Sequence, residues 1–385
     1  MNNIAGNKPA LVWITHLSVA FMVILWILPT LGLFVSSFRN ADQIAGSGWW
    51  RALFPTEQTL TLRTGDPETQ IQQGDIYVIE GNIFDEAGEG APSQLSAWGT
   101  SSRDVSAYEP GDTAELNDGE RLTIEADGAY RMESPQQMEG SRGQRVFVTG
   151  SVPPSLTFDN YQRVLFSGST TDGMQKAFFN TLTVTIPATV IPILVAAFAA
   201  YALAWMDFKG RALLIALIVA LLVVPLQLAL IPLLKLHLNI GIGKGYMGVW
   251  LAHTGFGLPM AIYLLRNYIA GLPRDIIENA RVDGATEFQI FTRIILPLSF
   301  PALASFAIFQ FLWTWNDLLV AKVFLIDASG RTTVMTAQIV ELMGTRGGDW
   351  EILATAAFVS IAVPLFVFFF MQKYLVRGLL AGSVK

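Results

Sequence analysis

The sequence predicts an all-α polytopic membrane protein with six transmembrane helices and a β-rich extracytoplasmic domain inserted after the first helix. The 385-residue chain is 52% hydrophobic and only 15% charged, whereas soluble domains carry about 25% charged residues. Residues 41–160 hold 20 Asp and Glu against seven Arg and no Lys, a net charge of −13, and the remainder has a net charge of +7. An acidic water-soluble segment therefore interrupts a basic, apolar chain.

Six stretches are apolar enough to cross a bilayer as helices, which takes about 20 mostly apolar residues. They are residues 11–35, 177–206, 212–234, 245–265, 298–326 and 352–371. Prolines inside several of them, such as Pro187 and Pro225, are tolerated because bundled helices satisfy the freed backbone groups. The first stretch has too long an apolar region for a cleaved signal peptide, so we expect it to be retained.

The short loops predict the orientation of these helices. If the N-terminus is cytoplasmic, the inner segments carry ten basic residues against five acidic ones, and basic residues are enriched in cytoplasmic loops. We therefore expect both termini in the cytoplasm. The long acidic segment then lies outside, because long loops translocate largely regardless of charge.

We expect three domains. Residues 1–55 contain the first helix, residues 56–150 form the β-rich insertion, and residues 151–385 form the core with five transmembrane helices. Runs typical of strands at 59–62, 76–79, 121–124 and 145–148 alternate with turn-forming stretches at 88–90, 117–119 and 127–128. The carboxylates would suit calcium, but EF-hand spacing is absent, and a solvated acidic surface is the favoured interpretation. With no cysteines and three widely spaced histidines, we expect no metal site.

The loop at residues 267–297 reads as two short helices around a glycine. Pro273 and Asp275 favour a helix start. Gly284 permits a backbone turn and is expected to let the two helices pack closely. Apolar residues at helical spacing, among them Ile276 and Phe288, would face the cytoplasm. The alternative is an interfacial helix that lies in the lipid headgroups.

This loop resembles the cytoplasmic loop of ABC importer permeases, written E-A-A, three residues, G, nine residues, I, any residue, L-P. The positions that carry the resemblance are Glu278, Asn279, Ala280, Gly284, Ile294, Leu296 and Pro297, and Asp283 belongs to the same loop. Asn279 departs from the usual alanine and slightly lowers helix propensity. The resemblance implies the type I importer permease fold in a bacterial inner membrane, with a coupling helix that docks on a separate ATPase.

Residues 158–166, 178–203 and 313–319 resemble the second permease of maltose-type carbohydrate importers, and the insertion after the first helix resembles α-glucoside permeases. The resemblance implies a sugar substrate and no cofactor or nucleic acid. The implied partners are an ATPase dimer, a sister permease and a periplasmic solute-binding protein. Gly382 and Lys385 resemble a C-terminal tail that contacts the ATPase, although the usual closing glycine is absent. The chain lacks a G-x-x-x-x-G-K-[ST] phosphate loop, so we expect no ATP hydrolysis by the chain itself.

Polar residues inside the predicted helices leave two interpretations open. Asp317 lies in an expected span, where an ionised carboxylate costs about 2.5–3.5 kcal/mol. With Trp313 and Asn316 it could form the wall or gate of a translocation path, or it could be a packing group paired with another helix. Asn180 and Gln227 are expected to form interhelical hydrogen bonds.

Two other functional classes compete with an importer permease. A membrane sensor would need a cytoplasmic output domain, yet the longest inner segment is the loop at 267–297. A secondary transporter would ordinarily show an internal repeat and intramembrane charges, and we find no clear repeat. An enzyme is disfavoured because no nucleophile and base occur in a recognisable arrangement.

Overall fold

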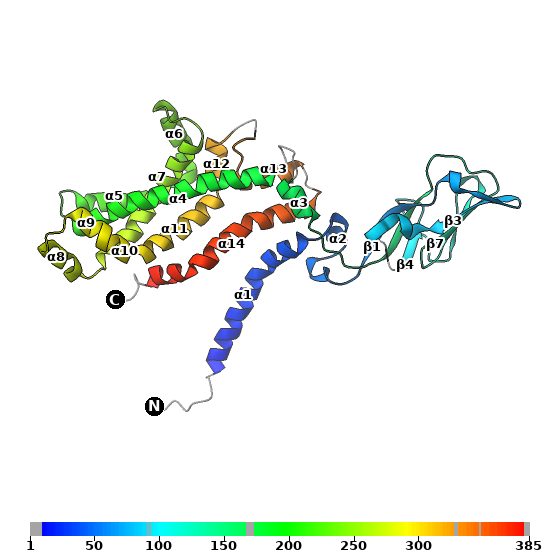
Figure 1. The fold of residues 1–385 in the computed structure, drawn as a ribbon, viewed down its shortest axis with the longest axis horizontal. Helices are drawn as coiled ribbons and strands as arrows, with labels where there is room; N and C mark the ends of the chain where they lie inside the picture. Colours follow the sequence, from blue (N-terminus) through cyan, green and yellow to red (C-terminus); the bar gives the residue numbers. More distant parts are fainter. Residues whose placement is uncertain are drawn as a thin grey trace. The chain divides into compact units, whose positions relative to one another are not determined.

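The computed structural model describes residues 10–90, 92, 94–166, 173–326, 330–345 and 348–380. The chain forms two compact units. The N-terminal unit comprises Met1–Tyr161 and Asp349–Thr355, and the helical unit comprises Gln162–Gly348 and Ala356–Lys385. Figure 1 shows the strands in cyan and the helices of the second unit in green to red.

The N-terminal unit starts with α1 (Ala10–Ser36), followed by α2 (Ala41–Gly46) and a short 3-10 turn, Trp49–Arg51. Leucine, valine, isoleucine and aromatic side chains on every side of α1 are exposed. A helix that is apolar all round is typical of a membrane span. The composition of α1 is therefore that of a membrane-spanning helix.

Side chains from distant segments satisfy the C-terminal end of α1. The amide of Asn160 donates to the backbone oxygens of Ser37 (3.0 Å) and Arg39 (2.8 Å), and the hydroxyl of Thr355 donates to Ser37 O (3.2 Å). Asn160 and Thr355 thus provide hydrogen-bond donors for carbonyls of the segment that directly follows α1. The Tyr161 hydroxyl, 2.7 Å from Ser37 Oγ, is half-buried, and this burial raises its pKa.

Eight strands follow, all paired antiparallel. They are β1 (Thr56–Arg63), β2 (Ile71–Gln73), β3 (Ile76–Asn82), β4 (Leu95–Gly99), β5 (Thr113–Glu115), β6 (Arg121–Ile124), β7 (Ala129–Ser134) and β8 (Arg145–Val152). One sheet has the order β1-β8-β4 and the other β2-β3-β7-β6-β5. The β-rich character of the insertion is confirmed, and each expected run lies inside β1, β3, β6 or β8. Short β2 and β5 carry too few residues to show an alternating pattern.

Both sheets contribute to a single hydrophobic core. Every second residue of β8 is buried, as expected for a strand with one solvated face. Trp98 of β4 is 0% exposed, and the centroid of its ring lies 4.8 Å from that of Tyr108. It belongs to a cluster with Leu122 of β6 and Val146 of β8. The insertion therefore has its own core.

The two ends of the insertion lie side by side. Thr56 pairs with Val152 at the start of the β1–β8 ladder, and Thr157 N donates to Phe38 O at 2.8 Å. The chain therefore enters and leaves the insertion at nearly the same point, close to the end of α1.

The helical unit holds the remaining helices. They are α3 (Asp159–Phe166, shared with the first unit), α4 (Met174–Trp205), α5 (Arg211–Leu221), α6 (Leu226–Asn239), α7 (Tyr246–Ala270), α8 (Arg274–Val282), α9 (Glu287–Ile290), α10 (Leu296–Leu298), α11 (Phe300–Trp315), α12 (Leu319–Phe324), α13 (Met335–Thr345) and α14 (Trp350–Leu380), whose first turns belong to the first unit. A π-helical turn, Phe291–Ile295, joins α9 to α10. Small buried residues such as Ala196, Ala200 and Ala261 lie in the core that α4, α7 and α11 share, and small residues let membrane helices approach closely.

The described residues contain four to six candidate membrane spans. Helices α1, α4, α7 and α14 each meet the requirement alone. The expected single helix at 212–234 is instead two helices, α5 and α6, bent by 110°. Pro225, at the start of α6, lacks an N–H and disfavours a helical conformation at the residue before it.

The expected span at 298–326 is also interrupted. Residues Glu287–Leu298 and Phe300–Trp315 meet at 70°, and the helix then ends at Trp315 before the separate short helix α12. Six continuous transmembrane helices are therefore not confirmed, although each bent pair has the length and composition of one span.

Replacing Trp98 with alanine should destabilise the insertion by about 3–5 kcal/mol, because it removes the largest side chain of an enclosed core. Limited proteolysis of the full chain should then cut within residues 56–152 while the helical unit stays intact. The matched control is Ile71→Ala, since Ile71 lies in β2 of the other sheet of the insertion and is 64% exposed. Equal protease resistance of the two variants would contradict this account of the core.

Candidate functional site

The loop at residues 267–297 is held against the helical bundle by buried apolar residues. Ile277 of α8 is 1% exposed, and Ile290 and Ile295 are likewise buried in the cluster that contains Ala200 of α4 and Leu265 of α7. The apolar face expected along this loop therefore points partly into the chain's own core.

The opposite side of the loop presents a mixed surface. Glu278 and Asn279 are exposed, and Ala280 is half-buried. Val282 is 87% exposed and Phe288 is 65% exposed. The exposed side of α8 and the start of α9 thus combine apolar contact area with carboxylates.

Gly284 lies between α8 and α9 in a left-handed conformation, with φ of +80°. A Cβ atom added there would meet nothing within 4 Å, so the expected close packing of the two helices at this glycine is wrong. The glycine is required because L-residues disfavour positive φ. Thr286 then caps α9 by accepting from Gln289 N, while the Gln289 side chain accepts from Thr286 N.

The second half of the motif coincides with irregular helix geometry. Ile294 lies in the π-helical turn and is half-buried, as is Leu296. Pro297 is exposed in the first turn of α10, where its missing N–H is tolerated. The chain turns by 70° at Ser299. The motif therefore occupies the bend that joins the loop to α11.

An ion pair crosses the glycine turn. Arg281 Nε donates to Glu287 Oε1 at 3.0 Å, and the other oxygen of Glu287 accepts from the hydroxyl of Tyr201 in α4. The hydrogen bond with Glu287 raises the pKa of the Arg281 guanidinium. Neither Arg281 nor Glu287 was predicted as a site residue, because ion pairing across six residues in a loop has no sequence signature.

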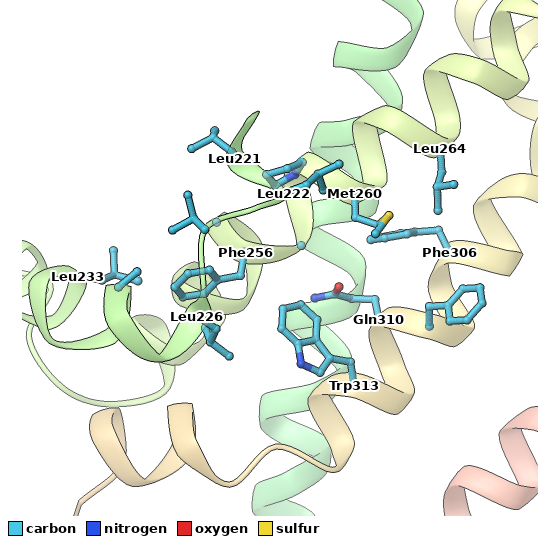
Figure 2. A pocket seen from close by; sticks show the side chains of 16 residues that line it. Leu221, Leu222, Leu226, Leu233, Phe256, Met260, Leu264, Phe306, Gln310 and Trp313 are labelled. Carbon is cyan, nitrogen blue, oxygen red and sulfur yellow. The ribbon is translucent and has the colours of Figure 1, made fainter. Parts of the chain in front are cut away.

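A cavity of about 790 Å³ lies between the α5–α6 pair, α7 and α11. Its lining comprises Leu221, Leu222, Val224, Leu226, Ala229, Leu233, Gly255, Phe256, Gly257, Pro259, Met260, Leu264, Phe306, Phe309, Gln310 and Trp313. Figure 2 shows the Gln310 amide and the Trp313 indole among apolar side chains. The cavity therefore offers extensive apolar contact and few hydrogen-bonding groups.

Gln310 is fixed at the floor of this cavity. Its Nε2 donates to the backbone oxygen of Ala188 in α4 at 3.0 Å and lies 3.4 Å from that of His253 in α7. A Cβ added at Gly257 would come within 2.7 Å of Gln310 Oε1. The glycine thus leaves the space that the amide occupies between α4 and α7.

The structure separates the three residues expected for a translocation path. Trp313 lines the cavity, whereas Asp317 caps α12 by accepting from Ala321 N at 3.0 Å. The Asp317 carboxylate is buried and lies 3.7 Å from His253 Nε2. Asn316 is exposed and donates to Leu312 O.

The structure gives different surroundings to the two other polar residues predicted to form interhelical hydrogen bonds, Asn180 and Gln227. Asn180 of α4 donates to the backbone oxygens of Arg331 and Thr333 and accepts from Tyr246 of α7, so its interhelical role is confirmed. Gln227 is exposed. The predicted tail contacts Gly382 and Lys385 lie outside the described residues.

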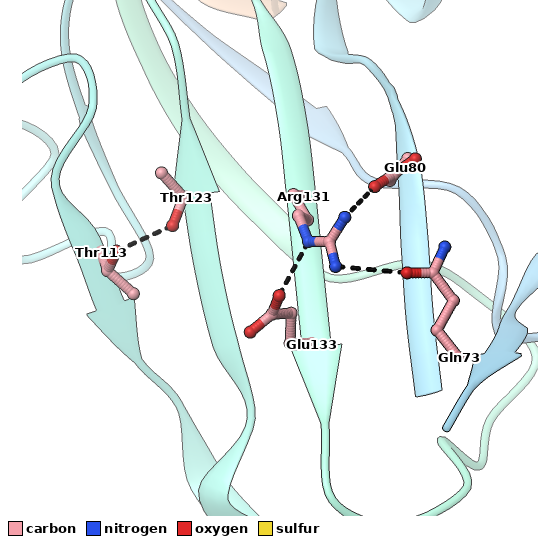
Figure 3. A network of polar contacts seen from close by, with 6 residues as sticks. All are labelled: Gln73, Glu80, Thr113, Thr123, Arg131 and Glu133. Carbon is pink, nitrogen blue, oxygen red and sulfur yellow. Dashed lines mark hydrogen bonds and ion pairs between the residues drawn. The ribbon is translucent and has the colours of Figure 1, made fainter. Parts of the chain in front are cut away.

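The outer face of the five-stranded sheet is a second polar surface (Figure 3). Arg131 of β7 donates to Glu133 at 2.7 Å and also binds Glu80 of the adjacent β3 and Gln73 of β2. Among the described residues, no group of three or more His, Cys, Asp and Glu is arranged to hold a metal ion. Ion pairs thus neutralise part of this acidic face.

Comparison with known proteins identifies the family of the chain. Residues 178–380 match the family described as binding-protein-dependent transport system inner membrane component. The α-glucoside transport system permease protein AglG of Rhizobium meliloti is 59% identical over 385 residues, which cover 99% of each chain. The chain belongs to this family of inner membrane components. It is thus a multi-pass membrane protein.

Two further similarities have narrower coverage. The osmoprotective compounds uptake permease protein GgtD of Synechocystis is 58% identical over 226 residues, or 59% of this chain and 74% of that protein. A solved bacterial ABC transporter involved in alginate import matches at 22% identity and a TM-score of 0.48, over 58% of this chain and 81% of that one. The family assignment depends on the sequence matches.

The residues that match the family contain the whole loop at 267–297 and every residue that lines the cavity. The β-rich insertion lies outside that match and inside the alignment with AglG, which spans 99% of this chain. The loop and the cavity therefore lie within the residues that match the family, and the insertion lies outside them.

Gly257→Ala should destabilise the helical unit by about 1–3 kcal/mol, because the new methyl displaces the Gln310 amide and breaks its buried hydrogen bonds. Gly255→Ala is the matched control. It lies two residues earlier in α7, and its added Cβ would meet nothing within 4 Å, so a gain of about 1 kcal/mol from helix propensity is expected. Thermal unfolding in one detergent measures both, and a stabilising Gly257→Ala would contradict the packing described.

Gly284→Glu should abolish transport while leaving membrane insertion intact, because it adds backbone strain of about 1–2 kcal/mol at positive φ and a bulky charge on the loop. Gly284→Asn should retain most transport, since asparagine tolerates this conformation. Uptake by cells, normalised to the amount of protein in the membrane, measures both. Normal uptake with Gly284→Glu would remove the loop from the mechanism.

Proposed function

We propose that this chain is a permease subunit of an ABC importer for an α-glucoside or a related oligosaccharide. The observation that carries the proposal is the 59% identity to an α-glucoside transport system permease over 99% of both chains. That alignment includes the β-rich insertion, so the likeness extends beyond the shared transport core.

In this proposal the chain crosses the inner membrane six times, with α1, α4, α7, α14 and the two bent pairs each forming one span. Both termini and the loop at 267–297 lie in the cytoplasm, and the acidic insertion lies in the periplasm. The excess of basic residues in the proposed inner segments supports this orientation.

The loop at 267–297 is the proposed coupling site for a separate ATPase dimer. Exposed Val282 and Phe288 supply apolar contact area, and Glu278 supplies a charge for a basic residue of the partner. The chain has no phosphate loop of its own. Gly382 and Lys385 are proposed as a further contact with the same ATPase.

A sister permease completes the proposed translocation path. The cavity lined by Trp313 and Gln310 is too apolar to hold a sugar by itself, because sugar hydroxyls require hydrogen-bond partners. Exposed leucine and valine side chains of α5, α6 and the turn between them, including Val223 and Leu228, are available to a second membrane subunit. This chain would then form one half of the path.

The mechanism follows from these parts. A periplasmic solute-binding protein delivers the sugar to the two permeases. ATP-driven closure of the ATPase dimer moves the coupling loop, and the path changes from inward-facing to outward-facing. ATP hydrolysis then returns the path to its inward-facing state. No catalytic residue of this chain takes part in the hydrolysis.

Purification of the tagged chain in mild detergent tests the partners. Mass spectrometry should find an ATPase with a phosphate loop and a second polytopic permease in the same complex. A chain that purifies alone as a stable homo-oligomer in several detergents would contradict the importer and favour a secondary transporter.

Reconstitution of that complex in liposomes, with its binding protein, tests the substrate. Maltose, sucrose or trehalose should stimulate ATP hydrolysis and enter the liposomes. Stimulation by osmoprotective compounds without any response to these sugars would overturn the α-glucoside assignment in favour of the class named for GgtD.

A further inference from the structure

We propose that Arg281, Glu287 and Tyr201 form a clamp that makes the coupling loop move as one body with α4. The inference rests on the proposed function, since it assigns positioning residues to the transmission of motion from the ATPase. It concerns side chains of this chain that lie behind the surface offered to the partner.

The clamp spans the only left-handed turn of the loop. Arg281 precedes Gly284 and Glu287 follows it, and the two side chains meet at 3.0 Å. Gly284 has φ of +80° and no atoms within 4 Å of the position of a Cβ, so no side-chain packing at the glycine itself restrains this turn. The ion pair therefore fixes the angle between α8 and α9.

The clamp also reaches the transmembrane bundle. Tyr201 is a buried residue near the C-terminal end of α4, and its hydroxyl donates to the second oxygen of Glu287. Its ring lies 5.5 Å from the ring of Phe291, which in turn lies 4.5 Å from that of Phe198. One carboxylate thus joins three segments: α8, α9 and α4.

A second chain of contacts extends the link to α7. Arg281 Nη2 lies 3.4 Å from the backbone oxygen of Trp205, at the end of α4, and Trp205 Nε1 donates to Ile269 O of α7 at 3.1 Å. The hydrophobic effect that holds these elements together is itself non-directional. The directional hydrogen bonds of the clamp select one register.

The clamp is suited to transmission rather than to folding. The side chains of Arg281 and Glu287 are 40% and 41% exposed, and half-exposed ion pairs contribute little to stability. Variants that lack the clamp should therefore fold and insert normally while losing the connection between loop and bundle.

The test uses the reconstituted complex of the full chain with its ATPase, sister permease and binding protein, and measures substrate transported per ATP hydrolysed. Glu287→Gln removes the charge, and Tyr201→Phe removes only the hydroxyl that reaches α9 from α4. Each should lower the ratio by about fivefold or more, with ATP hydrolysis and thermal stability preserved.

The matched control is Asp207→Asn, which removes another exposed ion pair, that of Asp207 with Arg211 at 3.0 Å. Its transport per ATP should equal that of the wild type. Equal ratios for Glu287→Gln and wild type would overturn the clamp.

A spectroscopic measurement distinguishes a change in the position of the loop from a general loss of structure. The chain has no cysteines, so spin labels introduced through Val282→Cys and Lys209→Cys report only the distance between α8 and the segment after α4. The distance distribution should be narrow with the clamp intact and broader with Glu287→Gln. An unchanged distribution would overturn the clamp, whereas a wild-type complex without ATP-dependent uptake would overturn the proposed function instead.

Discussion

Backbone groups without hydrogen-bond partners cannot be left in a bilayer, and this constraint accounts for much of the structure. A regular helix satisfies its own backbone, so every helix end or break in the membrane domain needs an outside donor or acceptor. Asn160 donates to two carbonyls after α1, Asp317 accepts from the first amides of α12, and Asn180 binds two carbonyls ahead of α13. These three polar side chains of an apolar sequence therefore bind backbone groups at or beside helix ends.

The same constraint separates the two parts of the chain. The insertion contains charged and turn-forming residues that only water can solvate, and it buries its apolar residues in a core of its own around Trp98. Its ends meet where Phe38 binds Thr157, so it adds a domain without separating α1 from the segment that follows. This geometry explains how a family of inner membrane components accommodates an insertion that the family match does not include.

The irregular region from Gly284 to Ser299 contains a positive-φ glycine, a π-helical turn and a 70° bend within a short stretch. Glycine adopts positive φ without steric cost, whereas the π-helical turn and the bend interrupt regular helical hydrogen bonding. Buried Ile277, Ile290 and Ile295 hold the loop to the bundle on one side. The other side keeps Val282 and Phe288 in solvent. The loop is therefore both attached to its own subunit and open to another.

The sequence by itself determined the membrane class, the β-rich insertion and the family, because hydropathy, charge segregation and a spaced motif are local properties of the chain. It also located the loop at 267–297 and the turn at Gly284. Only the tertiary structure decided that α5 and α6 are separate helices, that Asp317 caps α12, and that Gly284 is needed for its backbone angle rather than for close packing. It alone joined Tyr201 to Glu287, which are 86 residues apart. Breaks and pairings of this kind depend on which groups meet in space, and a linear pattern does not record that.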